Sequence, residues 1–146
     1  MKASSFSLLL TSLLFVSGEV ICGSTTNIIP TQDWSAESAE ARKSATPIII
    51  LFSKAGCAYC ERLKKEMLEP LADRKHGSFA RIRELDINRG GKITDFDGEK
   101  IRTKIFVSRY GIYATPTLML VDYQGHSLGA PIVGYNNLEN YLSYLE

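Results

Sequence analysis

The sequence has almost no net charge. Its 17 lysine and arginine residues are balanced by 16 aspartate and glutamate residues, which leaves a formal charge of +1 at pH 7. Proteins that hold nucleic acid or an anionic membrane surface electrostatically carry a clear basic excess. We therefore expect no nucleic-acid partner, and the function has to come from a local chemical site.

Metal-binding side chains are also scarce. A structural zinc site needs about four ligands, usually in two closely spaced pairs. Cys57 and Cys60 make one such pair, but Cys22, His76 and His126 do not form a second. We expect no zinc site. Two thiolates alone can hold Cu(I), so a copper-binding dithiol remains an alternative.

The only long apolar run lies at the N-terminus. It covers residues 6–16, "FSLLLTSLLFV", and is shorter than the roughly 20 residues of a membrane-spanning helix. Lys2 precedes it and small residues follow, a pattern typical of a secretory signal peptide. We predict a signal peptide over residues 1–23, cleaved after a residue between 18 and 23. An uncleaved N-terminal helix is the alternative.

Cys22 lies at this predicted boundary. A lipid-modified cysteine usually follows a small residue, whereas Ile21 precedes Cys22. Lipoprotein anchoring through Cys22 is therefore the less favoured interpretation, and we expect Cys22 to be removed or to lie in a loose N-terminus.

The remaining residues are enough for one domain. Residues 24–34 are polar and predict an extended arm, and residues 35–146 predict the domain. The run "IIILF" at 48–52 is apolar at every position, which is typical of a strand buried on both faces. Asp33 or Ser35 is the expected N-cap of the first helix. The predicted helices cover 35–45, 58–74 and 101–111, and Pro70 is expected to kink or end the second of them. A final helix is capped by Asn136 or Asn137. The predicted strands cover 48–52, 79–87, 115–122 and 128–135, with a loop or hairpin at 88–100.

This order predicts an α/β fold with a central mixed sheet and helices on both faces.

The predicted order places the two cysteines between a buried strand and the start of a helix. A purely structural Cys57–Cys60 disulfide would close a tiny loop and stabilise little. Helix N-terminal amides lower the pKa of a thiol, so Cys57 is the expected nucleophile, with Gly56 allowing the tight turn before it. Cys60, one turn further, would resolve the mixed disulfide.

"CAYC" after an isoleucine-rich strand, with "ATPT" at 114–117 opening a later strand, resembles the thioredoxin-fold family. The resemblance covers residues 35–146 and implies a thioredoxin-like fold without a cofactor. It also implies that Pro116 follows a cis peptide bond and packs against the dithiol, and that the backbone of Thr115 binds a substrate peptide. Tyr59 is then placed either to touch a substrate or to cover the sulfur.

Three further segments, "LDIN", "DFDG" and "YGIYATPTLMLVD", resemble small exported bacterial thioredoxins, including those associated with sulfur oxidation. That resemblance implies a periplasmic enzyme that reduces protein or small-molecule disulfides and takes electrons from a membrane-embedded donor. Disulfide isomerases share the tyrosine and the threonine but carry a dimerisation domain, for which this chain has no room. We therefore expect a monomer, with an isomerase-like or oxidase-like donor of disulfides as alternatives.

The sequence also departs from cytosolic thioredoxins. They carry a buried acid six residues before the first cysteine, where this chain has Leu51. Lys54 and Glu61 flank the cysteines and could tune the thiolate, although such charges are more often solvated. Trp34, the single tryptophan, is expected to pack rather than to react.

Overall fold

The structure, a computed structural model, describes residues 28–72 and 80–135. The strands in these residues are β1 (Ile29–Pro30), β2 (Ile48–Ser53), β3 (Arg81–Asp86), β4 (Lys92–Thr94), β5 (Lys100–Arg102), β6 (Thr117–Val121) and β7 (Ile132–Val133). The helices are α1 (Trp34–Ser44), α2 (Ala58–Leu63), the π-helical turn η1 (Lys64–Leu68), α3 (Glu69–Ala72) and α4 (Thr103–Arg109).

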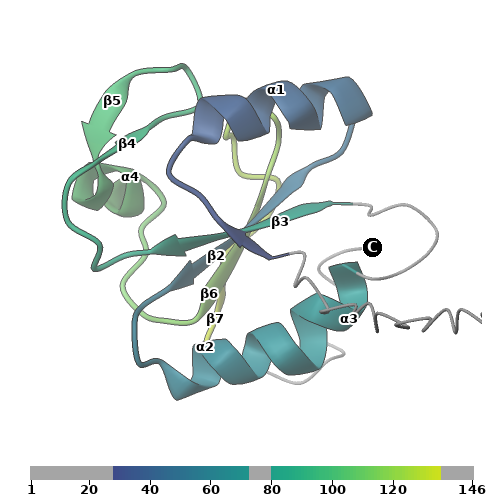
Figure 1. The fold of residues 1–146 in the computed structure, drawn as a ribbon, viewed down its shortest axis with the longest axis vertical. Helices are drawn as coiled ribbons and strands as arrows, with labels where there is room; N and C mark the ends of the chain where they lie inside the picture. The colour runs from purple at the N-terminus through teal and green to yellow at the C-terminus, as the bar shows by residue number, and fades with distance from the viewer. Residues whose placement is uncertain (1–27, 73–79, 136–146) are drawn as a thin grey trace, which may run out of the picture.

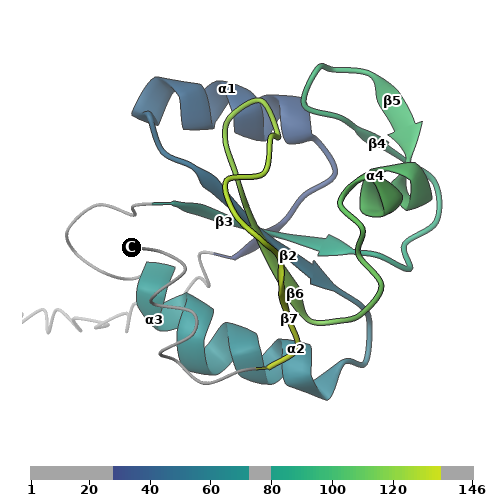
Figure 2. The ribbon, with the colours of Figure 1, turned by 180° about the vertical axis from the view of Figure 1, so that it is seen from behind.

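One mixed sheet forms the centre of the molecule, with strand order β1-β3-β2-β6-β7. Strand β3 runs parallel to both β1 and β2, whereas β6 is antiparallel to β2 and β7. Helices α1 and α4 lie on one side of this sheet, and the segment from α2 to α3 lies on the other (Figures 1 and 2). The predicted mixed sheet with helices on both faces is therefore confirmed.

Strand β2 is buried along its whole length. Ile49 and Leu51 join the apolar cluster on the α2 side of the sheet. Ile48, Ile50 and Phe52 join the cluster on the α1 side. Because successive strand residues point to opposite faces, a strand covered on both faces needs apolar residues throughout, as the sequence predicted.

Strand β3 distributes its charged residues between the two faces. Ile82 packs on the α2 side and Leu85 on the α1 side, so the apolar residues of this strand change face between them. Arg81 and Arg83 form ion pairs with Glu37 of α1, with N–O distances of 3.1 and 2.7 Å. Glu84 lies on the opposite, α2, face with Ile82.

Two predicted boundaries differ from the structure. The helix predicted at 101–111 begins at Thr103, because Ile101 pairs with Ile93 in the β4–β5 hairpin. The strand predicted at 128–135 is reduced to β7, which pairs only with the start of β6. The predicted signal peptide and final helix lie outside the described residues.

The helix after the cysteines does not end at Pro70. It changes from α to π geometry at η1 and returns to α geometry at α3, which contains Pro70. In the wider turn the amide of Glu69 bonds to the carbonyl of Lys64, five residues back. Proline cannot donate a backbone hydrogen bond and crowds the preceding turn. The π-helical turn just before Pro70 changes the hydrogen-bonding pattern where this proline enters the helix.

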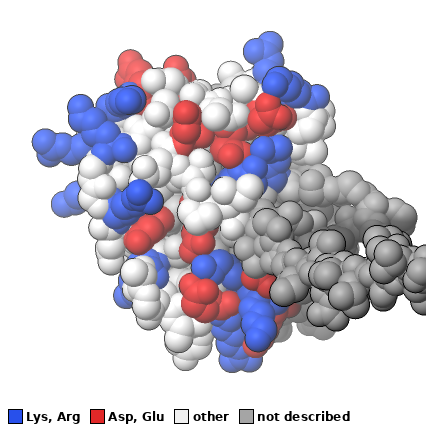
Figure 3. Space-filling view, in the orientation of Figure 1, with Lys and Arg blue, Asp and Glu red and all other residues white. Residues whose placement is uncertain are grey.

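The β4–β5 hairpin has one apolar and one basic face. Ile93 lies opposite Ile101, and both pack into the cluster on the α1 side. Lys92 lies directly opposite Arg102, a like-charge pairing that weakens a hairpin. Lysine and arginine side chains gather over this hairpin and α4 (Figure 3). The apolar pair therefore holds the hairpin to the domain.

Asp33 caps helix α1, one of the two residues predicted for this role. Its carboxylate accepts hydrogen bonds from the Ala36 amide, at 3.0 Å, and from the Ser35 hydroxyl, at 2.8 Å. These bonds, the Ala36 amide first, lower the pKa of Asp33 below its ordinary value of 3.8. The cap therefore stabilises the fold above that pH.

We expect Asp33→Ala to lower the free energy of unfolding by about 1 kcal/mol at pH 7, measured by urea denaturation. Because the pKa of Asp33 is lower in the folded state, the contribution of its charge is lost as the pH falls below about 4. Asp33→Asn is the matched control, since it keeps a capping oxygen without the charge. An Asp33→Ala variant as stable as the wild type would contradict this assignment.

No helix within residues 28–72 and 80–135 is both long and apolar enough to cross a membrane.

Candidate active site

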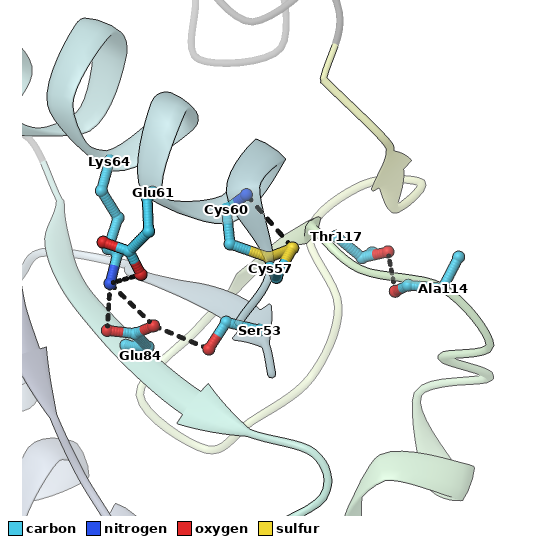
Figure 4. The surroundings of a disulfide bond; sticks show 8 residues. All are labelled: Ser53, Cys57, Cys60, Glu61, Lys64, Glu84, Ala114 and Thr117. Carbon is cyan, nitrogen blue, oxygen red and sulfur yellow. Dashed lines mark hydrogen bonds and ion pairs between the residues drawn. A yellow bond between two sulfur atoms is a disulfide. The ribbon is translucent and has the colours of Figure 1, made fainter. Parts of the chain in front are cut away.

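Cys57 and Cys60 form a disulfide at the start of α2. Their sulfurs are 2.10 Å apart and their Cα atoms 5.2 Å apart. Strand β2 brings the chain to this point, and Gly56 turns it into the helix with a φ of +73°. A φ in this region favours glycine, as the sequence suggested. Figure 4 shows the disulfide beside the start of the helix.

Cys57 occupies the N-cap position of α2. Its sulfur accepts a hydrogen bond from the Cys60 amide at 3.2 Å, and its carbonyl accepts from the amides of Cys60 and Glu61. The amides of a helix N-terminus point toward this sulfur and favour negative charge on it. When the disulfide opens, the same amide is in place to stabilise a Cys57 thiolate.

The two sulfurs differ in access to solvent. Cys57 is 7% exposed, and Cys60 is fully buried at 0%. A partner sulfur arriving from solvent therefore reaches Cys57 first. The predicted roles, Cys57 as nucleophile and Cys60 as resolving residue, require this order of access.

Thr115 and Pro116 lie at the same end of the sheet as the disulfide. Their peptide bond is cis, as the resemblance implied. Thr117, the next residue, pairs with Phe52 near the end of β2, which brings this loop beside the cysteines (Figure 4). Pro116 is buried, and its carbonyl accepts a hydrogen bond from the Gly134 amide at 2.8 Å.

Tyr59 does not lie in the core but is 63% exposed. Its ring lies 6.5 Å from that of Tyr135, whose hydroxyl donates to Glu66. The guanidinium of Arg62 lies over the Tyr135 ring at 4.5 Å. The sequence did not single out Tyr135, because its contacts with α2 and η1 join segments about 70 residues apart in the chain.

Three polar residues beneath α2 were also missed. The Lys64 ammonium lies 3.2 Å from Glu84 and 2.8 Å from Glu61. The Ser53 hydroxyl donates to Glu84 at 2.7 Å. The sequence offered one signal for this network, because Glu84 is a charged residue in the middle of a predicted strand. Its partners could not be found in this way, since they depend on the register of β2 with β3. Glu61, considered for tuning the site, thus enters this network, and Lys54 is exposed.

Within residues 28–72 and 80–135, no group of three or more His, Cys, Asp or Glu side chains could hold a metal ion. His126 pairs with Asp122 in the turn after β6, at 3.2 Å. Cys22 and His76 lie outside the described residues.

Comparison with protein families places this geometry in a known group. Residues 34–146 match the family described as the thioredoxin-like domain. The chain belongs to the thioredoxin-like domain family. No curated protein sequence matches the chain significantly.

Solved structures share this thioredoxin-like fold at low identity. A thioredoxin-fold protein from Helicobacter pylori is 22% identical, with a TM-score of 0.54, over 70% of this chain and 68% of the other. A mutant thioredoxin from Halobacterium salinarum is 18% identical, with a TM-score of 0.55, over 83% and 90%. The short form of spinach chloroplast thioredoxin f is 16% identical, with a TM-score of 0.57, over 82% and 92%. These likenesses establish the fold.

A thioredoxin-like domain with a Cys57–Cys60 disulfide supports thiol-disulfide oxidoreductase activity. The thioredoxin-like fold supplies a rigid strand before the cysteines and a helix after them. The dithiol itself carries the two electrons, so exchange needs only a partner disulfide or dithiol.

Proposed function

We propose that this protein is an exported enzyme that reduces disulfides of periplasmic partner proteins. The observation that carries the proposal is the asymmetry of the dithiol. Cys57 is at the helix N-terminus and keeps 7% exposure, and Cys60 is fully buried one turn behind it. Such a pair is built for one attacking and one resolving sulfur.

The reaction has two steps. The Cys57 thiolate attacks the partner disulfide, forming a mixed disulfide and releasing one partner thiolate. The Cys60 thiolate then attacks Cys57, which restores the Cys57–Cys60 disulfide and releases the second partner thiolate. Two electrons pass to the partner, and each released thiolate takes up a proton.

Substrate contact is assigned to the residues beside Cys57. Thr115 and Pro116 lie in the loop next to the disulfide, and the Thr115 backbone is proposed to bind an extended peptide of the partner. Tyr59 lies between the two cysteines in the sequence and is exposed, and it is proposed to contact the same partner.

Export and the source of electrons rest on the sequence. Lys2, the apolar run at 6–16 and the small residues after it support cleavage and release into the periplasm. A periplasmic reductase has to be reduced again from the cytoplasmic side, which requires an electron donor embedded in the membrane. The protein is proposed to act as a monomer.

One experiment tests both parts of the proposal. The full chain is expressed in a Gram-negative host, recovered by cell fractionation, and its N-terminus is determined by mass spectrometry. We expect a periplasmic protein that begins between residues 19 and 24. The reduction potential of its dithiol, measured against glutathione, is expected near the value of about −270 mV typical of thioredoxin.

A potential near about −120 mV would instead identify a donor of disulfides and contradict the direction of electron flow. Recovery in the cytoplasm with residue 1 intact would contradict export. Stoichiometric copper that stays with the reduced protein through dialysis would favour the Cu(I)-binding alternative.

A further inference from the structure

A small ion-pair network lies beneath the helix that carries the disulfide. Lys64 contacts both oxygens of the Glu84 carboxylate at 3.2 Å. Ser53 donates its hydroxyl to the same carboxylate at 2.7 Å. Figure 4 shows these three side chains between the helix and the sheet, with Glu61 above them. A partly buried carboxylate is therefore fixed by two donors close to the reacting sulfurs.

The helix geometry links this network to the resolving sulfur. Lys64 follows Cys60 by four residues, so both lie on the same side of the helix. That side faces the sheet, since Cys60 is fully buried and the Lys64 side chain is only 18% exposed. Ser53 is the last residue of β2, just before the turn that leads to Cys57.

The resolution step creates a need that this network can meet. Cys60 has to lose a proton before its sulfur can attack Cys57. Because Cys60 is fully buried, water does not reach it directly, and a neighbouring group has to receive the proton. Glu84 is a carboxylate of low exposure, 14%, on the α2 face of the sheet.

A cavity of about 250 Å³ connects Glu84 to solvent. It opens at the carboxyl ends of β1, β3 and β2, and its wall includes Ser53, Glu61 and Glu84. A space of this size holds several water molecules. A proton that reaches Glu84 can therefore leave without passing the disulfide. The charged groups that line this space are Lys54 and Glu61 from the cysteine loop and α2, Glu84 and Asp86 from β3, and Arg89 after β3.

Lys64 remains a cation while thiols react. Burial alone would lower its pKa, but hydrogen bonds and ionic attraction to Glu61 and Glu84 outweigh burial and raise the pKa of Lys64 above 10.5. The lysine therefore keeps the Glu84 carboxylate in position across the pH range of disulfide exchange.

We propose that Glu84, held in position by Lys64 and Ser53, receives the proton of Cys60 during resolution of the mixed disulfide. This inference rests on the proposed function, because it concerns the second step of that reaction. The Cys60 S–H bond breaks, and its proton passes to the Glu84 carboxylate and from there to water in the cavity. The Cys60 sulfur bonds to Cys57, and the bond from Cys57 to the partner sulfur breaks.

The test follows the two steps separately by stopped-flow absorbance. Reduced full-length protein is mixed with Ellman's reagent, an aromatic disulfide whose thiolate is coloured. Attack by Cys57 releases the first thiolate, and resolution by Cys60 releases the second. In Glu84→Gln we expect the second phase to slow at least about tenfold at pH 7. Its pH midpoint should move upward, and the first phase should change less than about twofold.

Glu40→Gln is the matched control, because it is the same carboxylate-to-amide change at an exposed residue of α1 that pairs with Lys43. Glu40 lies outside the network beneath α2, so this variant is expected to keep both phases near the wild-type rates. Ser53→Ala removes the hydroxyl and keeps the ion pair. Ser53→Ala tests the proposal if Glu84→Gln does not fold. In Ser53→Ala we expect the second phase to slow about threefold.

The role of Glu84 would be overturned if Glu84→Gln released the second thiolate at the wild-type rate from pH 5 to 9. If only Ser53→Ala folds, the same result in that variant would overturn it. Equal slowing of both phases would also overturn it, since that result indicates a structural effect. In either case a two-phase wild type would leave the proposed function standing. A wild type that releases no thiolate at all would instead contradict the proposed function.

Discussion

Cys60→Ser is expected to accumulate a stable mixed disulfide with its substrate, whereas Cys57→Ser is expected to lose disulfide exchange entirely. Of the two cysteines that the structure describes, Cys57 alone combines a place at the helix N-terminus with access to solvent. Without Cys60 the first attack proceeds, but no second thiolate releases the product. Without Cys57 the remaining sulfur is fully buried and cannot reach a partner.

The measurement is mass spectrometry under non-reducing conditions after incubation with a peptide disulfide. Cys60→Ser should gain the mass of one half of the peptide, and Cys57→Ser should gain nothing. Both variants are best made with Cys22→Ser, so that any third thiol in the mature protein does not contribute. The Cys57→Ser, Cys60→Ser double variant gives the background. Wild-type exchange by Cys57→Ser would refute the assigned roles.

Trp34→Ala is expected to produce the largest loss of stability, about 3–5 kcal/mol. Trp34 is fully buried at 0% exposure and stacks on Phe106 with ring centroids 5.2 Å apart. A second ring, that of Phe96, lies 5.6 Å away. Deleting the indole removes these contacts and leaves a cavity between α1 and the β4–β5 hairpin. Because small domains are stable by only about 5–15 kcal/mol, this loss is a large part of the total.

Urea unfolding measures the change. It is followed by circular dichroism, because a variant without the single tryptophan gives no tryptophan fluorescence. Trp34→Phe is the matched control. No residue that the structure describes accepts a hydrogen bond from the buried Trp34 indole nitrogen, so phenylalanine loses volume but no bond. Its loss should be clearly smaller. A loss below about 1 kcal/mol in Trp34→Ala would show that this packing does not stabilise the domain.

Features set by local sequence were predictable. The unbroken apolar run of β2 marked a strand buried on both faces. Asp33 was identified as a helix cap because capping depends on residues within one turn. The cysteine spacing and the proline of "ATPT" marked the end of the sheet where the disulfide lies.

Features set by distant contacts were not predictable. The start of α4 at Thr103 depends on pairing of Ile101 with Ile93, which alternation within one segment does not reveal. The partners of Glu84 come from β2 and η1, and its strand neighbour is Leu51. The sequence could only record that Leu51 replaces an expected acid. The register of two strands was needed to find a carboxylate next to that position.

The alternation of β3 has a consequence for how this protein can change. Its arginines face α1, together with the aromatic cluster that includes Trp34 and Phe106, while Glu84 faces the helix of the disulfide. Effects of substitutions at well-separated sites usually add. Substitutions on the α1 side can therefore change the stability of the domain with little effect on thiol chemistry. Substitutions around Glu84 can retune reactivity while the aromatic side keeps the domain folded.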